Sequence, residues 1–346
     1  MQSKEVELGG IPSSLYMVRI AVFTFGFLLN LLMFIILIRF RKPTDNILTT
    51  GIVPTMIDGL ICMVNVASFA ESMVKQMSGT QAYIICHFIS SYAIIWALIA
   101  ARVFINMLVT LFFFIQFLYP FMRIEQRRKP IRTVLIVGIP LSMATGIIPH
   151  LLTNRYAGDT NQCTTHSGAY FYAPMRLVTV FRLGVLVSFL YNFLLPVIGS
   201  IYLYHHVLRI LRLRDKNRDA YKEVHLCSIM DNWFMLLFAG IAELEKFMVR
   251  YPNSHNIQYD PFRSAILMLI LSLYSVVYPC LSIVFRRRYQ RPILDCLVYM
   301  GMNPTDSWLA KRLNRSEASE SRKQHTKTNE HPHRRPTGIY SHKNQH

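Results

Sequence analysis

The sequence predicts an all-α membrane protein whose core is a bundle of seven transmembrane helices. Three observations support this fold class. Hydrophobic residues make up 52% of the 346-residue chain, long stretches carry no charge, and 37 Lys and Arg outnumber 19 Asp and Glu. A soluble nucleic-acid-binding protein would also be basic, but it would spread its charges over a folded surface. Uncharged stretches separated by basic segments favour lipid-buried helices and argue against a nucleic-acid partner.

Seven apolar stretches are long enough to cross a bilayer, whose hydrocarbon core of about 30 Å needs about 20 helical residues. The second stretch contains one charge, Asp58, and the third contains one charge, Arg102. The chain after Met300 is polar and offers no further span. The predicted spans cover residues 20–38, 46–70, 83–119, 133–152, 183–208, 226–248 and 264–285.

Basic residues at the ends of the spans predict the orientation, because Lys and Arg near helix ends are retained in the cytosol. They cluster after the first, third, fifth and seventh spans, as at Arg286–Arg288. We therefore expect a plasma-membrane protein with residues 1–19 outside the cell and a transmembrane domain at 20–300, which includes a membrane-parallel helix at 286–297. The polar tail at 301–346 is expected to be cytosolic and largely disordered, and the basic segments are expected to attract anionic membrane lipids.

Two cysteines lie on the expected extracellular side. Cys86 opens the third span, and Cys163 lies in the second outer loop. An oxidising compartment favours a disulfide between them, which would hold this loop over the bundle, while two unpaired thiols are the alternative. Cys296 follows the seventh span, where a cysteine beside the membrane is either a palmitoylation site or a plain thiol.

The order of the spans and several single residues resemble the rhodopsin-like G-protein-coupled receptors over most of the chain. Asn30 and Asp58 are separated as the family's first-helix asparagine and second-helix aspartate are. Pro196 and Tyr204 match its fifth-helix proline and tyrosine, and Tyr278-Pro279 resembles the start of its seventh-helix NPxxY motif. The chain looks like a divergent branch of this family, of the invertebrate orphan or serpentine chemoreceptor kind.

The resemblance implies which residues correspond to the family's activation motifs. Phe112-Phe113-Phe114 takes the place of the DRY segment, so the arginine that contacts the G protein is missing. Tyr278 replaces the asparagine of the seventh-helix motif, and Ser282 replaces its tyrosine. The motif equivalents are Phe113, Pro196, Tyr204, Tyr278 and Pro279.

The two intramembrane charges are expected to pair. Each costs about 3 kcal/mol or more at the centre of a span, so Asp58 and Arg102 should face the bundle interior. In the family alignment Arg102 stands beside the site of a bound sodium ion, and its guanidinium would replace that ion. The polar core would be completed by Asn30, Asn106 and Ser275. A static pair that fixes packing and a pair that takes part in switching both remain open.

The resemblance also implies a ligand site with mixed aromatic and polar walls. Its ligand would be a peptide or a small chemosensory molecule that reaches the bundle from outside the cell. The residues at the corresponding positions are Trp96, Ser188, Asn192, Phe238, Glu245, Met268 and Ser272.

The predicted function is therefore a receptor that transmits ligand binding to a heterotrimeric G protein through a rearrangement of helices. A decoy receptor that binds ligand without coupling is one alternative, because of Phe112-Phe113-Phe114. A transporter is another, although the spans lack the inverted repeats and Gly-rich half-helices that transporters often show. The spans contain no GxSxG serine and no His cluster with metal-ligand spacing, so we expect neither an enzyme nor a cofactor.

The predicted topology is tested by tags at the two chain ends. An odd number of spans puts the ends on opposite sides of the membrane, so an amino-terminal tag should bind antibody on intact cells and a carboxyl-terminal tag only after permeabilisation. Immunofluorescence on both preparations measures this. Two tags accessible from the same side would contradict seven spans.

Overall fold

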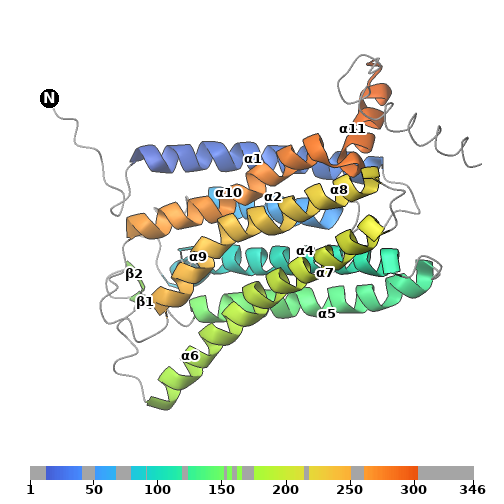
Figure 1. Ribbon diagram of the computed structural model, residues 1–346. Helices are drawn as coiled ribbons and strands as arrows, with labels where there is room; N and C mark the ends of the chain where they lie inside the picture. The colour runs from blue at the N-terminus through green and yellow to red at the C-terminus, as the bar shows by residue number, and fades with distance from the viewer. Residues whose placement is uncertain are drawn as a thin grey trace, which may run out of the picture. The chain divides into compact units, whose positions relative to one another are not determined.

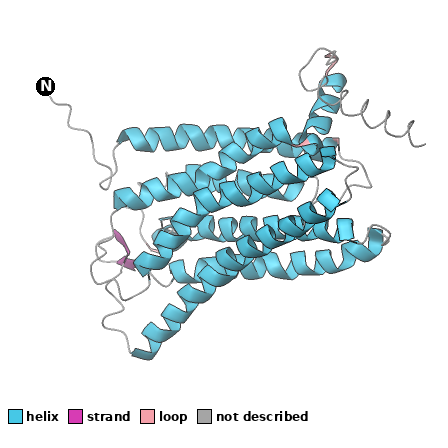
Figure 2. Cartoon of the chain, in the orientation of Figure 1, coloured by secondary structure: helices cyan, strands magenta, loops and turns pink. Residues whose placement is uncertain are grey.

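The computed structural model describes residues 13–40, 51–67, 79–90, 92–118, 124–151, 154–157, 162–165, 175–213, 218–250 and 261–302. The chain divides into two compact units, Met1–Tyr289 and Gln290–His346. Nearly all of the described residues in the first unit are helical, as Figure 2 shows.

The long helices of the first unit lie side by side (Figure 1). The helices of this unit are, in chain order, α1 (Ser13–Arg39), α2 (Ile52–Ala67), α3 (Thr80–Ile84), α4 (Ala93–Leu118), α5 (Ile124–Leu151), α6 (Met175–Phe189), α7 (Leu195–Leu213), α8 (Arg218–Ser228), α9 (Phe234–Arg250) and α10 (Pro261–Phe285). Two short strands, β1 (Asn154–Ala157) and β2 (Gln162–Thr165), pair antiparallel between α5 and α6. No strand was expected from the sequence.

Helix α4 is the centre of the bundle. It packs against α2, α5 and α7, and most of its residues from Ile95 to Phe113 are buried. Its apolar sequence explains this position, because a helix that is hydrophobic on all sides is stable only where every face is covered by protein or lipid. A polar side chain on α4 therefore points into the protein interior and needs a partner there.

Helix α1 has an outward face of large apolar side chains. Phe25, Leu28, Leu32 and Ile35 are each more than half exposed, while Phe23 and Met33 on its inner side are buried. An apolar patch of this length is unfavourable in water and typical of a helix that contacts lipid.

Five helical segments are long and apolar enough to cross a membrane, judged over the described residues alone: Met17–Arg39, Thr80–Ile115, Arg182–Arg212, Val224–Leu244 and Ile266–Phe285. Two shorter apolar helices, Ile52–Ala67 and Thr133–Ile148, occupy the positions of the second and fourth predicted spans. The structure thus fits a helical, multi-pass membrane protein. Seven crossings stay a prediction.

Within the described part of the chain, three π-helical turns interrupt the helices: η2 (Ile85–Ser90), η4 (Leu190–Leu194) and η5 (Ile229–Trp233). Pro196 lies two residues after η4, and a proline has no N–H for the helix ladder and clashes with the carbonyl four residues earlier, which here belongs to Asn192 in η4. A wider turn at this point is one way for a helix to accommodate that clash. Turns of this kind often occur at functional sites.

Helix α11 (Arg287–Tyr299) begins in the first unit and continues into the second. It lies where the sequence predicts a short helix, and its orientation to the membrane stays a prediction. Residues 1–12 and 303–346, which include most of the predicted outer segment and tail, lie outside the described residues.

The close approach of α1 to its neighbours predicts a strict size limit at Gly26. A Cβ atom there would lie 2.6 Å from Val276 Cγ2 and 2.9 Å from Cys62 Sγ. G26A should therefore lower the free energy of unfolding by about 1–3 kcal/mol through overpacking.

The matched control is G184A on α6, where a Cβ would meet no atom within 4 Å. Alanine there should keep or increase stability, because it favours helix by up to about 1 kcal/mol over glycine. Thermal unfolding of the purified, detergent-solubilised proteins compares the two. Equal stabilities would argue against the packing of α1 described above.

Candidate functional site

The structure brings the two predicted intramembrane charges together. Asp58 on α2 and Arg102 on α4 are both fully buried, and Arg102 Nε lies 3.0 Å from Oδ1 and 3.2 Å from Oδ2 of Asp58. Neither side chain reaches solvent, so each supplies the counter-charge that the other needs.

The rest of the Arg102 guanidinium contacts amide and aromatic groups. Nη1 donates to Asn106 Oδ1, one helical turn further along α4. Nη2 donates to Tyr274 Oη on α10 at 3.4 Å. The guanidinium carbon lies 4.4 Å from the ring centroid of Tyr278 and 5.4 Å from that of Tyr274. Cation–π contacts of this kind gain strength when the cation is desolvated.

The other predicted members of the polar core, Asn30 and Ser275, lie on α1 and α10. Asn30 Nδ2 donates to the backbone carbonyls of Gly26 and Ser275, both at 2.9 Å. The Ser275 side chain hydrogen-bonds Asp58. The polar core therefore ties α1, α2, α4 and α10 together.

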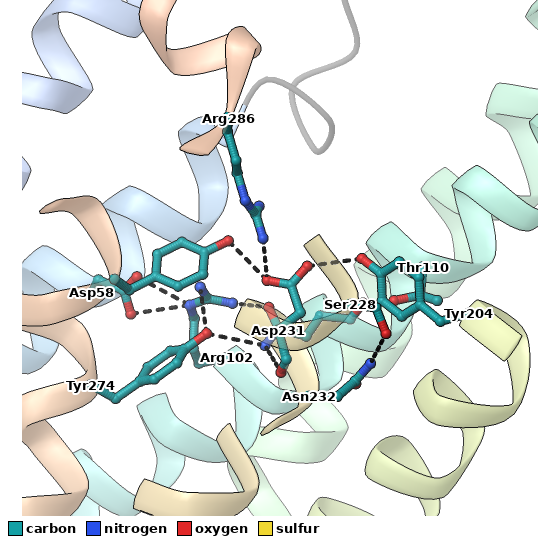
Figure 3. A network of polar contacts seen from close by, with 11 residues as sticks. Asp58, Arg102, Thr110, Tyr204, Ser228, Asp231, Asn232, Tyr274 and Arg286 are labelled. Carbon is teal, nitrogen blue, oxygen red and sulfur yellow. Dashed lines mark hydrogen bonds and ion pairs between the residues drawn. The ribbon is translucent and has the colours of Figure 1, made fainter. Parts of the chain in front are cut away.

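A second buried carboxylate, Asp231, was not predicted as a site residue. It lies in the π-helical turn η5, just before α9, and is 2% exposed. Its carboxylate accepts from Tyr204 Oη at 2.9 Å, from Tyr278 Oη at 3.1 Å and from Arg286 Nη2 at 2.5 Å. Figure 3 shows Asp231 between Arg286 on one side and Tyr204 on the other. The Asp231 carboxylate thus connects η5 with α7, with α10 and with Arg286, the residue that follows α10.

Tyr278 connects the two ion pairs. Its ring contacts both guanidiniums, with its centroid 4.4 Å from the Arg102 carbon and 5.0 Å from the Arg286 carbon, and its hydroxyl donates to Asp231. Asn106 Nδ2 adds a second link, to the backbone carbonyl of Asp231 at 3.4 Å. We call the set Asp58, Arg102, Asn106, Tyr204, Asp231, Tyr274, Tyr278 and Arg286 the buried network (Figure 3).

Arg286 lies just beyond the last candidate span. The Asp231 carboxylate beside it stabilises the charged form of its guanidinium. Burial by itself would lower the pKa of the guanidinium, but the Asp231 carboxylate holds that pKa well above its usual value. Burial also raises the pKa of the nearby Tyr289 phenol. At neutral pH Arg286 therefore remains charged while Tyr289 remains neutral.

A separate polar cluster joins the start of α1, the end of α2 and the middle of α10. Arg19 is 6% exposed and donates to Tyr92 Oη at 3.1 Å and to Asn65 Oδ1 at 3.0 Å. Asn65 Nδ2 in turn donates to Ser272 Oγ at 3.0 Å. Arg19 belongs to the predicted outer segment 1–19, but α1 begins at Ser13 and carries it into the bundle. We call Arg19, Asn65, Tyr92 and Ser272 the Arg19 cluster.

The predicted ligand-contact residues fall into different surroundings. Trp96 and Met268 are buried in the main apolar core, with Phe238 packed against it. Ser272 belongs to the Arg19 cluster. The side chain of Glu245 lies outside the described residues.

Ser188 and Asn192 face α5. The Asn192 amide hydrogen-bonds the hydroxyls of Ser142, Thr145 and Ser188, so these groups satisfy one another across a helix–helix contact. Polar side chains often join helices in this way within membranes. A role for either residue in ligand binding stays a prediction.

Among the motif equivalents, Tyr204 and Tyr278 belong to the buried network, whereas Phe113 is part of the apolar core. Pro279 lies inside α10. The arrangement places the tyrosines where they contact charged groups.

Four described cysteines, Cys62, Cys227, Cys280 and Cys296, are free thiols. Cys86 is fully buried and is not one of them, while the side chain of Cys163 lies outside the described residues. The Cys86–Cys163 disulfide and the palmitoylation of Cys296 both stay predictions.

Comparison with known proteins found no family model that matches this chain and no matching curated protein.

The buried pair predicts a non-additive response to mutation. D58N or R102Q alone leaves one charge buried without its partner, which costs about 3–5 kcal/mol. D58N/R102Q removes both charges and should cost clearly less than the sum of the two single changes. Thermal or denaturant unfolding of the solubilised variants measures this, and additive losses would show that the two groups do not interact.

Proposed function

We propose that the chain is a seven-helix signalling receptor of the plasma membrane, which couples an extracellular ligand to a heterotrimeric G protein. The observation that supports it most is the buried network, in which two ion pairs on different helices share Tyr278. Charged groups inside a membrane are costly, and where they occur they commonly serve function.

Helix α10 is the element best suited to carry a signal. Ser272 belongs to the Arg19 cluster, Tyr274 and Tyr278 contact Arg102, and Arg286 follows the helix directly. A ligand that displaced α10 at Ser272 would therefore also displace the groups that surround the two ion pairs. Such a ligand shifts the balance of states only if it binds them with different affinity.

The topology of this proposal has an extracellular amino terminus and a cytosolic carboxyl terminus, with a Cys86–Cys163 disulfide on the outer side. In that orientation the Arg19 cluster lies toward the outside and the Asp231–Arg286 pair toward the cytosol. The ligand would then approach one end of the bundle, and the G protein would meet the other.

A transporter is a second candidate, because buried ion pairs also mark ion and substrate pathways. Asp58 and Asp231 are two such carboxylates, joined through Arg102, Tyr278 and Asn106. Flux measured in proteoliposomes distinguishes it from a receptor. Ion or solute uptake that Y278F abolishes, in the absence of G-protein activation, would favour the transporter.

The receptor proposal predicts that Y278F raises basal nucleotide exchange on a G protein that the chain activates. The change removes the hydroxyl that donates to Asp231 but keeps the ring between the two arginines, so it weakens the resting arrangement without unpairing a charge. We expect an increase of roughly fivefold, within the range of coupling energies of two-state switches.

The assay uses cells that express the chain at their surface with a panel of G proteins, and with peptide and small-molecule libraries. Y202F is the matched control, because Tyr202 on α7 is 61% exposed. Silence of the chain and of Y278F across the panel, despite surface expression, would instead support a decoy receptor.

A further inference from the structure

The short segment after α10 has two anchors on different helices. Arg286 binds Asp231 in η5 at 2.5 Å. Three residues later, the ring of Tyr289 lies against Gly51, where the hydroxyl occupies the position that a Cβ atom would take. Gly51 has φ 82°, a conformation that glycine adopts without strain. The segment Arg286–Tyr289 therefore joins the start of α9 to the start of α2.

The two arginines of the buried network differ in their access to solvent. The side chain of Arg102 is 1% exposed, whereas that of Arg286 is 11% exposed. Releasing Arg102 from Asp58 would leave a charge in the apolar interior, at a cost of several kcal/mol. Arg286 lies at the end of the bundle, where a released guanidinium can turn toward water or lipid headgroups.

Asp231 does not depend on Arg286 for all of its hydrogen bonds. Without the arginine its carboxylate still accepts from Tyr204 and Tyr278. Both partners thus have an alternative environment once the ion pair opens, which lowers the cost of the open state. A conformational switch requires a contact whose closed and open forms are both low enough in free energy to be populated.

We propose that the Asp231–Arg286 ion pair is a releasable latch between α9 and α10, and that Tyr289 holds the segment after α10 on α2 when the latch opens. Release frees the start of α9 to move away from the end of α10, while the Asp58–Arg102 pair stays closed as the fixed part of the network. The inference rests on the proposed function, since it names the contact through which a receptor of this kind is regulated.

The test measures the distance between α8 and α10 with spin labels at His225 and Val284. Both positions are exposed and lie within two turns of Asp231 or Arg286 in the chain. The full-length chain is studied in lipid nanodiscs without G protein, in a background in which the free cysteines are replaced. R286Q should increase the population at longer distance by about fivefold or more. A distribution identical to that of the unsubstituted chain would overturn the latch.

Matched variants separate the latch from a general loss of structure. R209Q removes a charge from an exposed position on α7 and should leave the distances unchanged. The exchanged pair D231R/R286D should restore the short distance relative to R286Q. If R286Q does not fold, D231N takes its place, since it removes the negative charge of the same ion pair and keeps the size of the side chain. An unchanged distance in D231N would then overturn the proposal.

Nucleotide exchange is measured on the same variants, so that the two hypotheses can fail independently. A longer distance in R286Q together with higher basal exchange supports both the latch and the receptor. A longer distance without any exchange supports the latch and counts against G-protein coupling. Higher exchange with an unchanged distance supports the receptor and counts against the latch.

Discussion

The high cost of a charge in an apolar interior explains most of the polar architecture of this protein. Asp58, Arg102 and Asp231 are buried in or between apolar helices, and each is surrounded by donors or acceptors from other helices. Because no solvent can replace a lost partner, these contacts restrict how the helices pack. Apolar contacts, which lack direction, allow many more arrangements. The ion pairs therefore select one packing of α2, α4 and α10 among those that the apolar surfaces permit.

The sequence predicts some of the site well, for a simple reason. Asp58 and Arg102 stand out as single charges in long apolar stretches, so their burial and pairing follow from desolvation alone. The same argument applies to Asp231, which lies in the predicted span 226–248, but the other charges of that span obscured it. Arg286 looked like one more member of a basic segment. Its pairing depends on where α9 meets α10, which local sequence does not contain.

The ligand-contact residues were harder to predict, because assigning a residue to one face of a helix assumes that every turn of the helix is a regular α-helical turn. The apolar stretch 183–208 predicts one continuous transmembrane helix. The structure has a π-helical turn at Leu190–Leu194, and such a turn holds an extra residue and rotates one half of the helix against the other. Asn192 in this turn contacts Ser142 and Thr145 on α5, and Ser188 hydrogen-bonds Asn192. Pro196 was a visible sign of irregularity, but the sequence does not say whether a proline causes a kink or a wider turn.

The free thiols of this chain differ in their surroundings, and that difference has a practical use. Cys62 is fully buried beside Gly26 and Val276, whereas Cys280 is exposed on the outer side of α10. An alkylating reagent that dissolves in lipid can thus reach Cys280 in the folded bundle, and reaches Cys62 only when α1 separates from α2. Mass spectrometry of the alkylated protein shows which of the two cysteines reacts first. A reaction at Cys62 reports the separation of α1 from α2, and no cysteine has to be introduced.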